Sequence, residues 1–132
     1  MNDRPDTLEL LRCVSHTLTR EILPGAQPEQ LYTLRMIANA LGIATRELES
    51  HDINAVAEIR GLNTLYALYG ALDGETTPAA ELHAYNRHFA QDIRRGAFET
   101  SRALEAALRQ HLRATARAKL AAAYPKGLDD LK

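Results

Sequence analysis

The chain has 132 residues, of which 45% are hydrophobic and 25% are charged, and its formal net charge is -1. This composition supports a packed core and excludes an intrinsically disordered chain. A nearly balanced charge without a block of one sign argues against a nucleic-acid-binding protein. The length suits one domain, which we expect to span residues 1–132.

Cysteine usage and the N-terminal sequence bear on the compartment. Cys13 is the single cysteine, so no intramolecular disulfide can form, which favours a reducing compartment. Residues 1–12 contain acids and no apolar segment, which is unlike a secretory signal. No apolar run approaches the roughly 20 residues that a membrane-spanning helix needs. We therefore expect a cytoplasmic protein of bacterial type that does not contact a membrane.

Alanine and leucine dominate the apolar residues, and both are strong helix formers. No stretch alternates apolar and polar residues over the length of a strand. The sequence therefore predicts an all-α protein. Short connections between the helices favour antiparallel neighbours, and so an up-and-down bundle of four to five helices.

The first predicted helix begins at Asp6. This residue is a good N-cap, and Glu9 three residues later completes a capping-box pattern. Pro24 and Gly25 end the helix. Its predicted inner side comprises Leu8, Leu11, Ser15, Leu18 and Ile22, and Leu10 and Val14 widen it.

The second predicted helix opens at Pro28, runs to about Glu49 and is followed by a turn at residues 50–52. It carries two apolar stripes more than a third of a turn apart, which is typical of a helix covered on two sides. One stripe comprises Leu34, Ile37, Leu41, Ala44 and Leu48, and the other Met36, Ala40 and Ile43.

The rest of the chain reads as further helices. Residues 53–72 change face at Gly61, which predicts a kink or break there. Residues 73–78 read as a loop, with Thr77 and Pro78 as the N-cap and first position of the next helix. That helix has Leu82, Tyr85, Phe89 and Ile93 on its inner face and stops at Gly96. The last helix runs from about Glu99 to Ala123, with Leu104, Leu108 and Leu112 as its core face.

One polar stripe in the second helix is a candidate ligand site. Arg35, Asn39, Gly42 and Arg46 are spaced by four, three and four residues, so they share one face. Two guanidinium groups with an amide between them could hold a carboxylate or phosphate, and Gly42 would allow a close approach. The alternative is a solvent-exposed edge, or ion pairs with acids of a neighbouring helix.

A second polar line lies on the core face of the last helix, where His111, Thr115 and Lys119 repeat every four residues. Unpaired burial of such groups costs about 1–3 kcal/mol each, so they need partners. Either they form a polar pocket with the second helix, joined by Asn86, or they bond to backbone and reach solvent.

Other chemistry finds little support in the sequence. Four arginines on the last helix form a basic ridge, which fits a solvated face better than an acidic partner. The five histidines lack metal-ligand spacing, and no nucleophile, acid or base stands in a catalytic pattern. We therefore expect no metal, no cofactor and no catalytic residue. The ridge comprises Arg102, Arg109, Arg113 and Arg117.

Four segments together resemble a bacterial family of domains of unknown function that occurs alone or attached to aminoglycoside-phosphotransferase-like proteins. They read RPDTLELLRCVSHTLTREILP, LRMIANALGIATRELE, LHAYNRHFAQDIRRGAFE and HLRATARAKLAAAYPKGL. Genes of that family often lie near acyl-CoA dehydrogenases. The family's pattern also has an Asn where Tyr124 precedes Pro125 here, so a role of that Asn does not carry over. Residues matching the pattern are Arg35, Asn39, Arg46, Asn86, Arg94, His111, Arg113, Thr115 and Lys119.

The resemblance implies no activity, only an accessory relationship to a phosphotransferase-like or acyl-CoA dehydrogenase partner. The sequence therefore predicts a non-enzymatic helical interaction protein. The alternative is a binder of a small anionic ligand, of phosphate or acyl-CoA type, through Arg35, Asn39 and Arg46 with His111 and Lys119. A homodimer is expected, because the second apolar face of the second helix and the Tyr66–Tyr69 side of the next helix need more cover than one chain provides.

Overall fold

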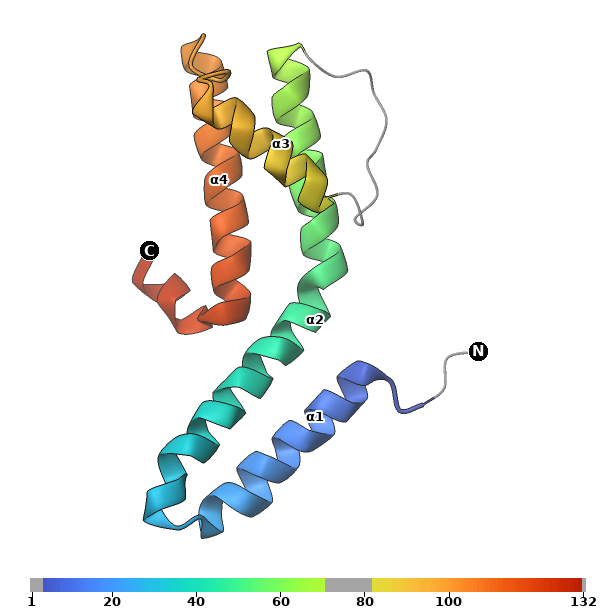
Figure 1. Cartoon of the computed structure of the whole chain (residues 1–132), viewed down its shortest axis with the longest axis vertical. Helices are drawn as coiled ribbons and strands as arrows, with labels where there is room; N and C mark the ends of the chain where they lie inside the picture. Colours follow the sequence, from blue (N-terminus) through green and yellow to red (C-terminus); the bar gives the residue numbers. More distant parts are fainter. Residues whose placement is uncertain (1–3, 71–81, 132) are drawn as a thin grey trace. The chain divides into compact units, whose positions relative to one another are not determined.

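A computed structural model describes residues 4–70 and 82–131, and within these every regular element is helical (Figure 1). The all-α prediction is confirmed. The α-helices are α1 (Thr7–Thr17), α2 (Pro28–Tyr69), α3 (Leu82–Arg94) and α4 (Arg102–Ala123). The shorter elements are the π-helix η1 (Leu18–Ile22) and the 3-10 helices η2 (Leu23–Gly25) and η4 (Pro125–Leu131).

The chain divides into two compact units. Unit 1 comprises residues 1–50 and 122–132, and unit 2 comprises residues 51–121. The expectation of one domain stays a prediction. The predicted loop at residues 73–78 lies outside the described residues. Along the part of the chain that the structure describes, no helix combines the length and apolar character needed to cross a bilayer.

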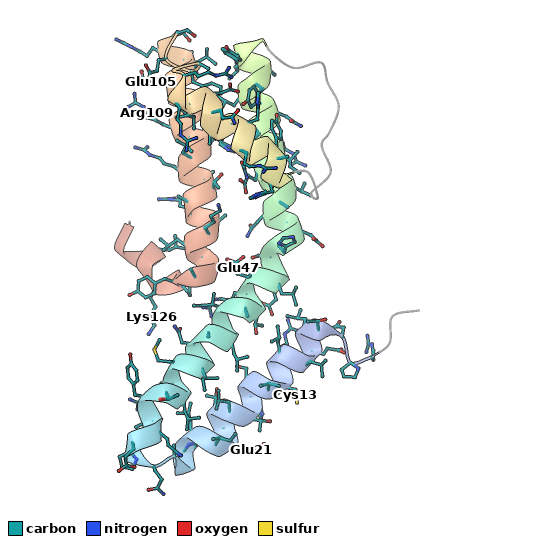
Figure 2. All side chains as sticks on the ribbon, in the orientation of Figure 1. Cys13, Glu21, Glu47, Glu105, Arg109 and Lys126 are labelled. Atoms are coloured by element: carbon teal, nitrogen blue, oxygen red, sulfur yellow. The ribbon has the colours of Figure 1, made fainter. Side chains whose placement is uncertain are left out.

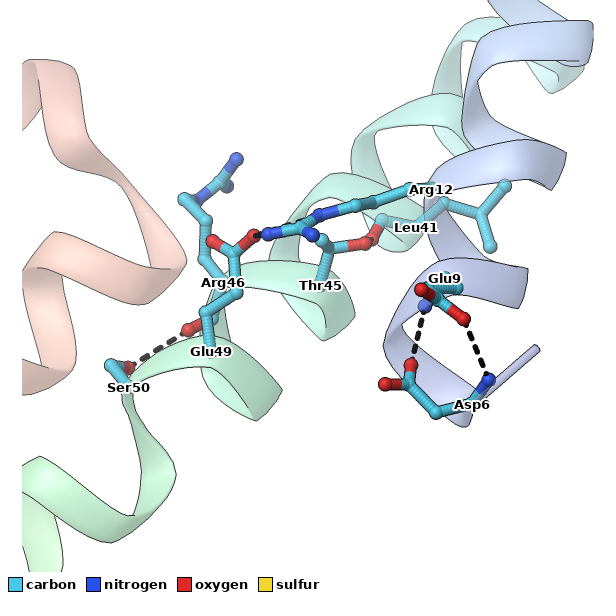
Figure 3. Close-up of polar contacts among 8 residues, drawn as sticks. All are labelled: Asp6, Glu9, Arg12, Leu41, Thr45, Arg46, Glu49 and Ser50. Carbon is cyan, nitrogen blue, oxygen red and sulfur yellow. Dashed lines mark hydrogen bonds and ion pairs between the residues drawn. The ribbon is translucent and has the colours of Figure 1, made fainter. Parts of the chain in front are cut away.

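Helix α1 begins with the predicted capping box. The backbone N–H of Glu9 donates to Asp6 Oδ1 at 2.8 Å, and the backbone N–H of Asp6 donates to Glu9 Oε2 at 3.0 Å (Figure 3). Each bond satisfies an N–H that would otherwise lack a partner at the helix start. The first turn of α1 is therefore fixed by its own sequence.

The end of α1 differs from the predicted regular helix. Five residues, Leu18–Ile22, form the π-helix η1, in which the N–H of Leu23 reaches back to the carbonyl of Leu18. The 3-10 turn η2 follows and contains Pro24 and Gly25, where the sequence predicted the end. The predicted stop is therefore confirmed, and the change of helix type before it is a finding of the structure.

Helix α2 corrects two predictions. It continues from Pro28 to Tyr69, so the predicted turn at residues 50–52 and the predicted break at Gly61 are both wrong. Ser50, in the predicted turn, donates its hydroxyl to the carbonyl of Arg46 at 2.8 Å and so bonds within the helix. Gly61 lies beside the ring of His111, so the missing side chain makes room for that ring.

Unit 1 has a small buried core. Helix α1 lies along the first half of α2, and Arg12 joins the two through an ion pair with Glu49. Among the described residues of this unit, Leu18 and Ala122 are the buried apolar side chains. Most of the apolar surface of its helices therefore stays accessible.

Unit 2 has a larger aromatic core. Six buried residues from α2, α3, α4 and the turn before α4 pack together, and Phe98, Leu62 and Leu65 are almost fully enclosed. The predicted inner faces of α3 and α4 are largely confirmed, but Leu112 is 43% exposed. His111, one residue earlier, is buried in this part of α4 instead. The cluster comprises Leu62, Leu65, Tyr66, Phe89, Phe98 and Leu104.

The predicted end of α3 is also confirmed. Gly96 has a φ of 72°, a left-handed conformation that favours glycine. This conformation reverses the chain so that Phe98 enters the core between α3 and α4.

Candidate functional site

A groove in unit 1 runs between the C-terminal part of α1, the π-helix η1 and the middle of α2. Its volume is about 330 Å³, at the small end of the range for ligand pockets. We call it the basic groove, because three of its side chains are arginines and its lining includes no acid. It is lined by Arg12, Ser15, His16, Thr19, Arg20, Gly42, Thr45 and Arg46.

Arg12 is held at the groove by a carboxylate on α2. Its Nη2 donates to Glu49 Oε1 at 2.6 Å, and its Nε donates to the same oxygen at 3.2 Å (Figure 3). Both side chains are more than a third exposed, so this pair adds little stability. Its main effect is to orient one edge of the Arg12 guanidinium toward Glu49, which leaves the Nη1 hydrogens for another acceptor.

Arg46 is held by a backbone carbonyl. Its Nε donates to the carbonyl of Ala122 at 2.7 Å, and this carbonyl belongs to the last turn of α4, where the helix leaves its carbonyls without intrahelical donors. The Nη1 atom lies over Gly42, where an added Cβ would stand 3.2 Å from it. The glycine therefore gives the guanidinium its place beside the groove.

Two hydroxyls of the groove already donate their protons to the backbone. Thr19 Oγ1 donates to the carbonyl of Ser15 at 2.7 Å, and Thr45 Oγ1 donates to that of Leu41 at 2.8 Å. A hydroxyl has one proton, so each oxygen can then only accept. The side chains that can donate to an anion in this groove are consequently the arginines, Ser15 and His16.

Part of the predicted polar stripe in the second helix lies at the basic groove, and part does not. Arg46 and Gly42 line the basic groove, whereas Arg35 and Asn39 are exposed and lie outside its lining. Their role as ligand-binding residues stays a prediction. The sequence reasoning missed Arg12, His16 and Arg20. Their spacing of four residues along the first helix was a visible signal for a shared basic face.

The predicted residues of unit 2 form a second polar cluster. Asn86 Nδ2 donates to Glu58 Oε1 at 2.6 Å, which joins α3 to α2. His111 is 8% exposed, with its ring edge-to-face against Phe89 at 5.4 Å between centroids. Burial lowers the pKa of His111, and the nearby carboxylate of Glu58 opposes this shift in part. The imidazole is therefore favoured in its neutral form.

The other two residues of the predicted line on α4 are less enclosed. Thr115 is half-buried and Lys119 is exposed. Asn86 and His111 thus approach one carboxylate, Glu58, while a shared role for Thr115 and Lys119 stays a prediction. On the same helix, Arg109 of the basic ridge pairs with Glu105 one turn earlier, as a solvated face does (Figure 2).

Asp92, which sequence reasoning did not single out, is a buried carboxylate of unit 2. It accepts hydrogen bonds from Tyr66 Oη at 2.5 Å and from Arg95, and His88 Nε2 lies 3.3 Å away. Burial alone would raise the pKa of Asp92, but the bonds from Tyr66 and Arg95 outweigh it and lower that pKa. Burial and the contact with Asp92 raise the pKa of Tyr66. Because these partners satisfy its hydrogen-bonding capacity, we assign this carboxylate a structural role in the core of unit 2.

Metal binding finds no geometric support in residues 4–70 and 82–131. There, no three side chains of histidine, cysteine, aspartate or glutamate are grouped to hold an ion. Among the described residues, the basic groove gathers three arginines, and several helices present accessible apolar side chains.

These features define a small all-α protein with an anion-compatible groove and accessible apolar helices. The chain belongs to the family described as domain of unknown function DUF6285, whose pattern matches residues 24–127. The match covers α2, α3 and α4, while Arg12, His16 and Arg20 of the groove precede it. Comparison with curated proteins gives no match, and neither does comparison with solved structures.

Proposed function

We propose that this chain is a non-enzymatic helical interaction protein that associates through the exposed side of α2. One observation carries the proposal: a continuous row of apolar residues on this helix is accessible. Tyr32 is 74% exposed, Met36 49% and Ile37 46%. We call this row the outer face of α2, which comprises Tyr32, Met36, Ile37, Ala40, Ala44 and Leu48.

The spacing supports a single binding surface. Successive residues of an α-helix are turned by about 100°, so positions four apart lie nearly in line. The outer face therefore forms a band on one side of α2. Gly42, Thr45 and Arg46, which line the basic groove beside α1, fall on the other side. An exposed apolar band of this kind is a common mark of a protein-interaction site.

We propose a second copy of the chain as the occupant of this surface. The six side chains of the outer face are uncharged, with Glu47 at the C-terminal end of the band, and a two-fold interface requires one patch that fits itself. Ala40 and Ala44 lie near its centre. Their small side chains would let two α2 helices approach closely, since the distance between packed helices depends on the side chains at the contact.

The matched substitutions Ala44→Glu and Ala67→Glu test this proposal. Both positions are exposed on α2, but Ala67 lies far along the helix from the outer face. A buried unpaired carboxylate is costly, so Ala44→Glu should dissociate the dimer, whereas Ala67→Glu should not. Light scattering of the unmodified chain should give twice the mass of one chain. A monomeric unmodified chain, or equal effects of both substitutions, would contradict the homodimer.

The family resemblance supports a second proposal, an accessory role beside a bacterial phosphotransferase-like protein or an acyl-CoA dehydrogenase. Such a partner would bind the dimer on apolar surface that the outer face does not use, such as Leu10 and Val14 of α1, both about half exposed. Affinity purification of the tagged chain from its host, followed by mass spectrometry, should recover one of these enzymes. Recovery of neither would count against the accessory role.

A further inference from the structure

We propose that the basic groove of unit 1 is a binding site for a small phosphate monoester. The groove and the outer face of α2 lie on different sides of the helix, so this proposal stands independently of the dimer. The charge of the groove supports it, and so do the donors that remain available, the size of the groove and the local helix geometry.

The charge of the groove matches a dianion. It contains Arg12, Arg20 and Arg46, and one adjoining carboxylate, Glu49, is paired with Arg12. Three arginines and one carboxylate leave about two positive charges uncompensated. A phosphate monoester carries a charge of about −1.5 to −2 at pH 7, closer to this balance than a single carboxylate.

The guanidinium groups approach the groove from three elements. Arg12 is on α1, Arg20 on η1 and Arg46 on α2. Arg12 and Arg46 are each held at one edge, by Glu49 and by the carbonyl of Ala122. Their remaining N–H groups are therefore oriented before a ligand arrives, which lowers the entropy lost on binding. Planar guanidinium groups are well suited to phosphate oxygens.

The size and the hydroxyls of the groove narrow the ligand class. A volume of about 330 Å³ suits a small phosphorylated metabolite better than a nucleotide or a coenzyme A ester. Thr19 and Thr45 present acceptor oxygens, because their protons go to the backbone. A ligand with hydroxyl groups near its phosphate could donate to these oxygens, and inorganic phosphate would lack this contribution.

The π-helix η1 is an independent pointer to a site here. Wide turns of this kind are rare and occur frequently at functional sites. In this chain the π-helix contains Thr19 and Arg20 in their positions in the groove.

Titration of the labelled full-length chain with glycerol 3-phosphate, followed by NMR, tests the proposal. Amide signals of residues 12–20 and 42–46 should shift saturably, and glycerol or sodium chloride at matched ionic strength should not reproduce the shifts. Arg20→Gln should weaken binding by about tenfold or more, the loss expected for one charge-assisted hydrogen bond. Arg113→Gln removes an exposed arginine from α4 and is the matched control.

Arg20 is exposed and takes no part in the Arg12–Glu49 or Arg46–Ala122 contacts, so its substitution should leave unit 1 folded. Ala44→Glu should bind glycerol 3-phosphate like the unmodified chain, which separates this site from the dimer interface. Absence of saturable shifts at millimolar ligand would overturn the proposal. So would equal weakening by Arg20→Gln and Arg113→Gln, because a diffuse charge effect would then explain the binding.

Discussion

His111 is a polar residue that is buried among apolar neighbours. Its ring occupies the space that Gly61 leaves open, and a Cβ added at Gly61 would stand only 2.5 Å from the imidazole Nδ1. Phe89 covers the ring from α3, and Glu58 is the charged group that acts on it. The folded chain therefore tolerates the neutral imidazole better than the imidazolium.

This burial predicts a loss of stability at mildly acidic pH. The unfolded chain protonates His111 near its ordinary pKa of 6.5, whereas the folded chain does so only at lower pH. Below about pH 6.5 the unfolded state thus binds more protons, and the free energy of unfolding decreases as the pH falls. Urea denaturation between pH 7.5 and about pH 5 should show this slope.

The substitution His111→Gln should reduce that slope, and His83→Gln, at an exposed position of α3, should keep it. The lowered pKa of Asp92 contributes a separate loss at more acidic pH, below the ordinary aspartate value of 3.8. A slope unchanged in His111→Gln would show that other groups cause the effect.

At the scale of the elements, local signals in the sequence predicted most helix ends. Asp6 with Glu9 and Pro24 with Gly25 act through bonds and backbone preferences within a few residues, and so does Gly96. The predicted turn at residues 50–52 was wrong because polar residues such as Ser50 can either cap a helix or bond within it. The predicted break at Gly61 was wrong because the glycine makes room for the ring of His111, which lies on α4 fifty positions away in sequence.

Less of the basic groove than of the fold was predicted from the sequence, because the groove also depends on contacts between segments far apart in the chain. Periodicity placed Arg46 and Gly42 on one face, but it could not show which part of that face would meet α1. Arg35 belongs to the same stripe and is exposed. The groove depends on how two helices are paired, which spacing within one helix does not determine.

The continuity of α2 gives a prediction for a proline substitution. His51→Pro places proline in the helix interior, where it removes a backbone hydrogen bond and costs about 3 kcal/mol. Glu29→Pro, in the first turn, is the control, because its N–H has no partner within the helix. Circular dichroism and thermal denaturation should show a clear loss for His51→Pro alone. A harmless His51→Pro would support the turn that the sequence suggested.

At the scale of the whole molecule, the two units differ in how much apolar surface they enclose. Unit 2 buries a cluster of aromatic and aliphatic side chains, while the buried apolar residues described in unit 1 are Leu18 and Ala122. A unit with so little enclosed surface gains stability from any partner that covers its helices.

Unit 1 should therefore depend on association for part of its stability. Because a dimer is stabilised by mass action, the thermal midpoint of the unmodified chain should rise with protein concentration. The midpoint of Ala44→Glu should be lower and independent of concentration. Scanning calorimetry over a wide concentration range makes the comparison, and a constant midpoint for the unmodified chain would speak against dimer-linked stability.

The π-helix makes this end of the hairpin sensitive to a change in chain length. Its hydrogen bond from Leu23 to Leu18 spans five residues instead of four, so the turn holds one residue more than an α-helical turn would. Deletion of one residue within Leu18–Ile22 would let the segment close as an ordinary α-helix. Thr19 and Arg20 belong to this turn and line the groove, so such a deletion would alter the groove at its η1 end.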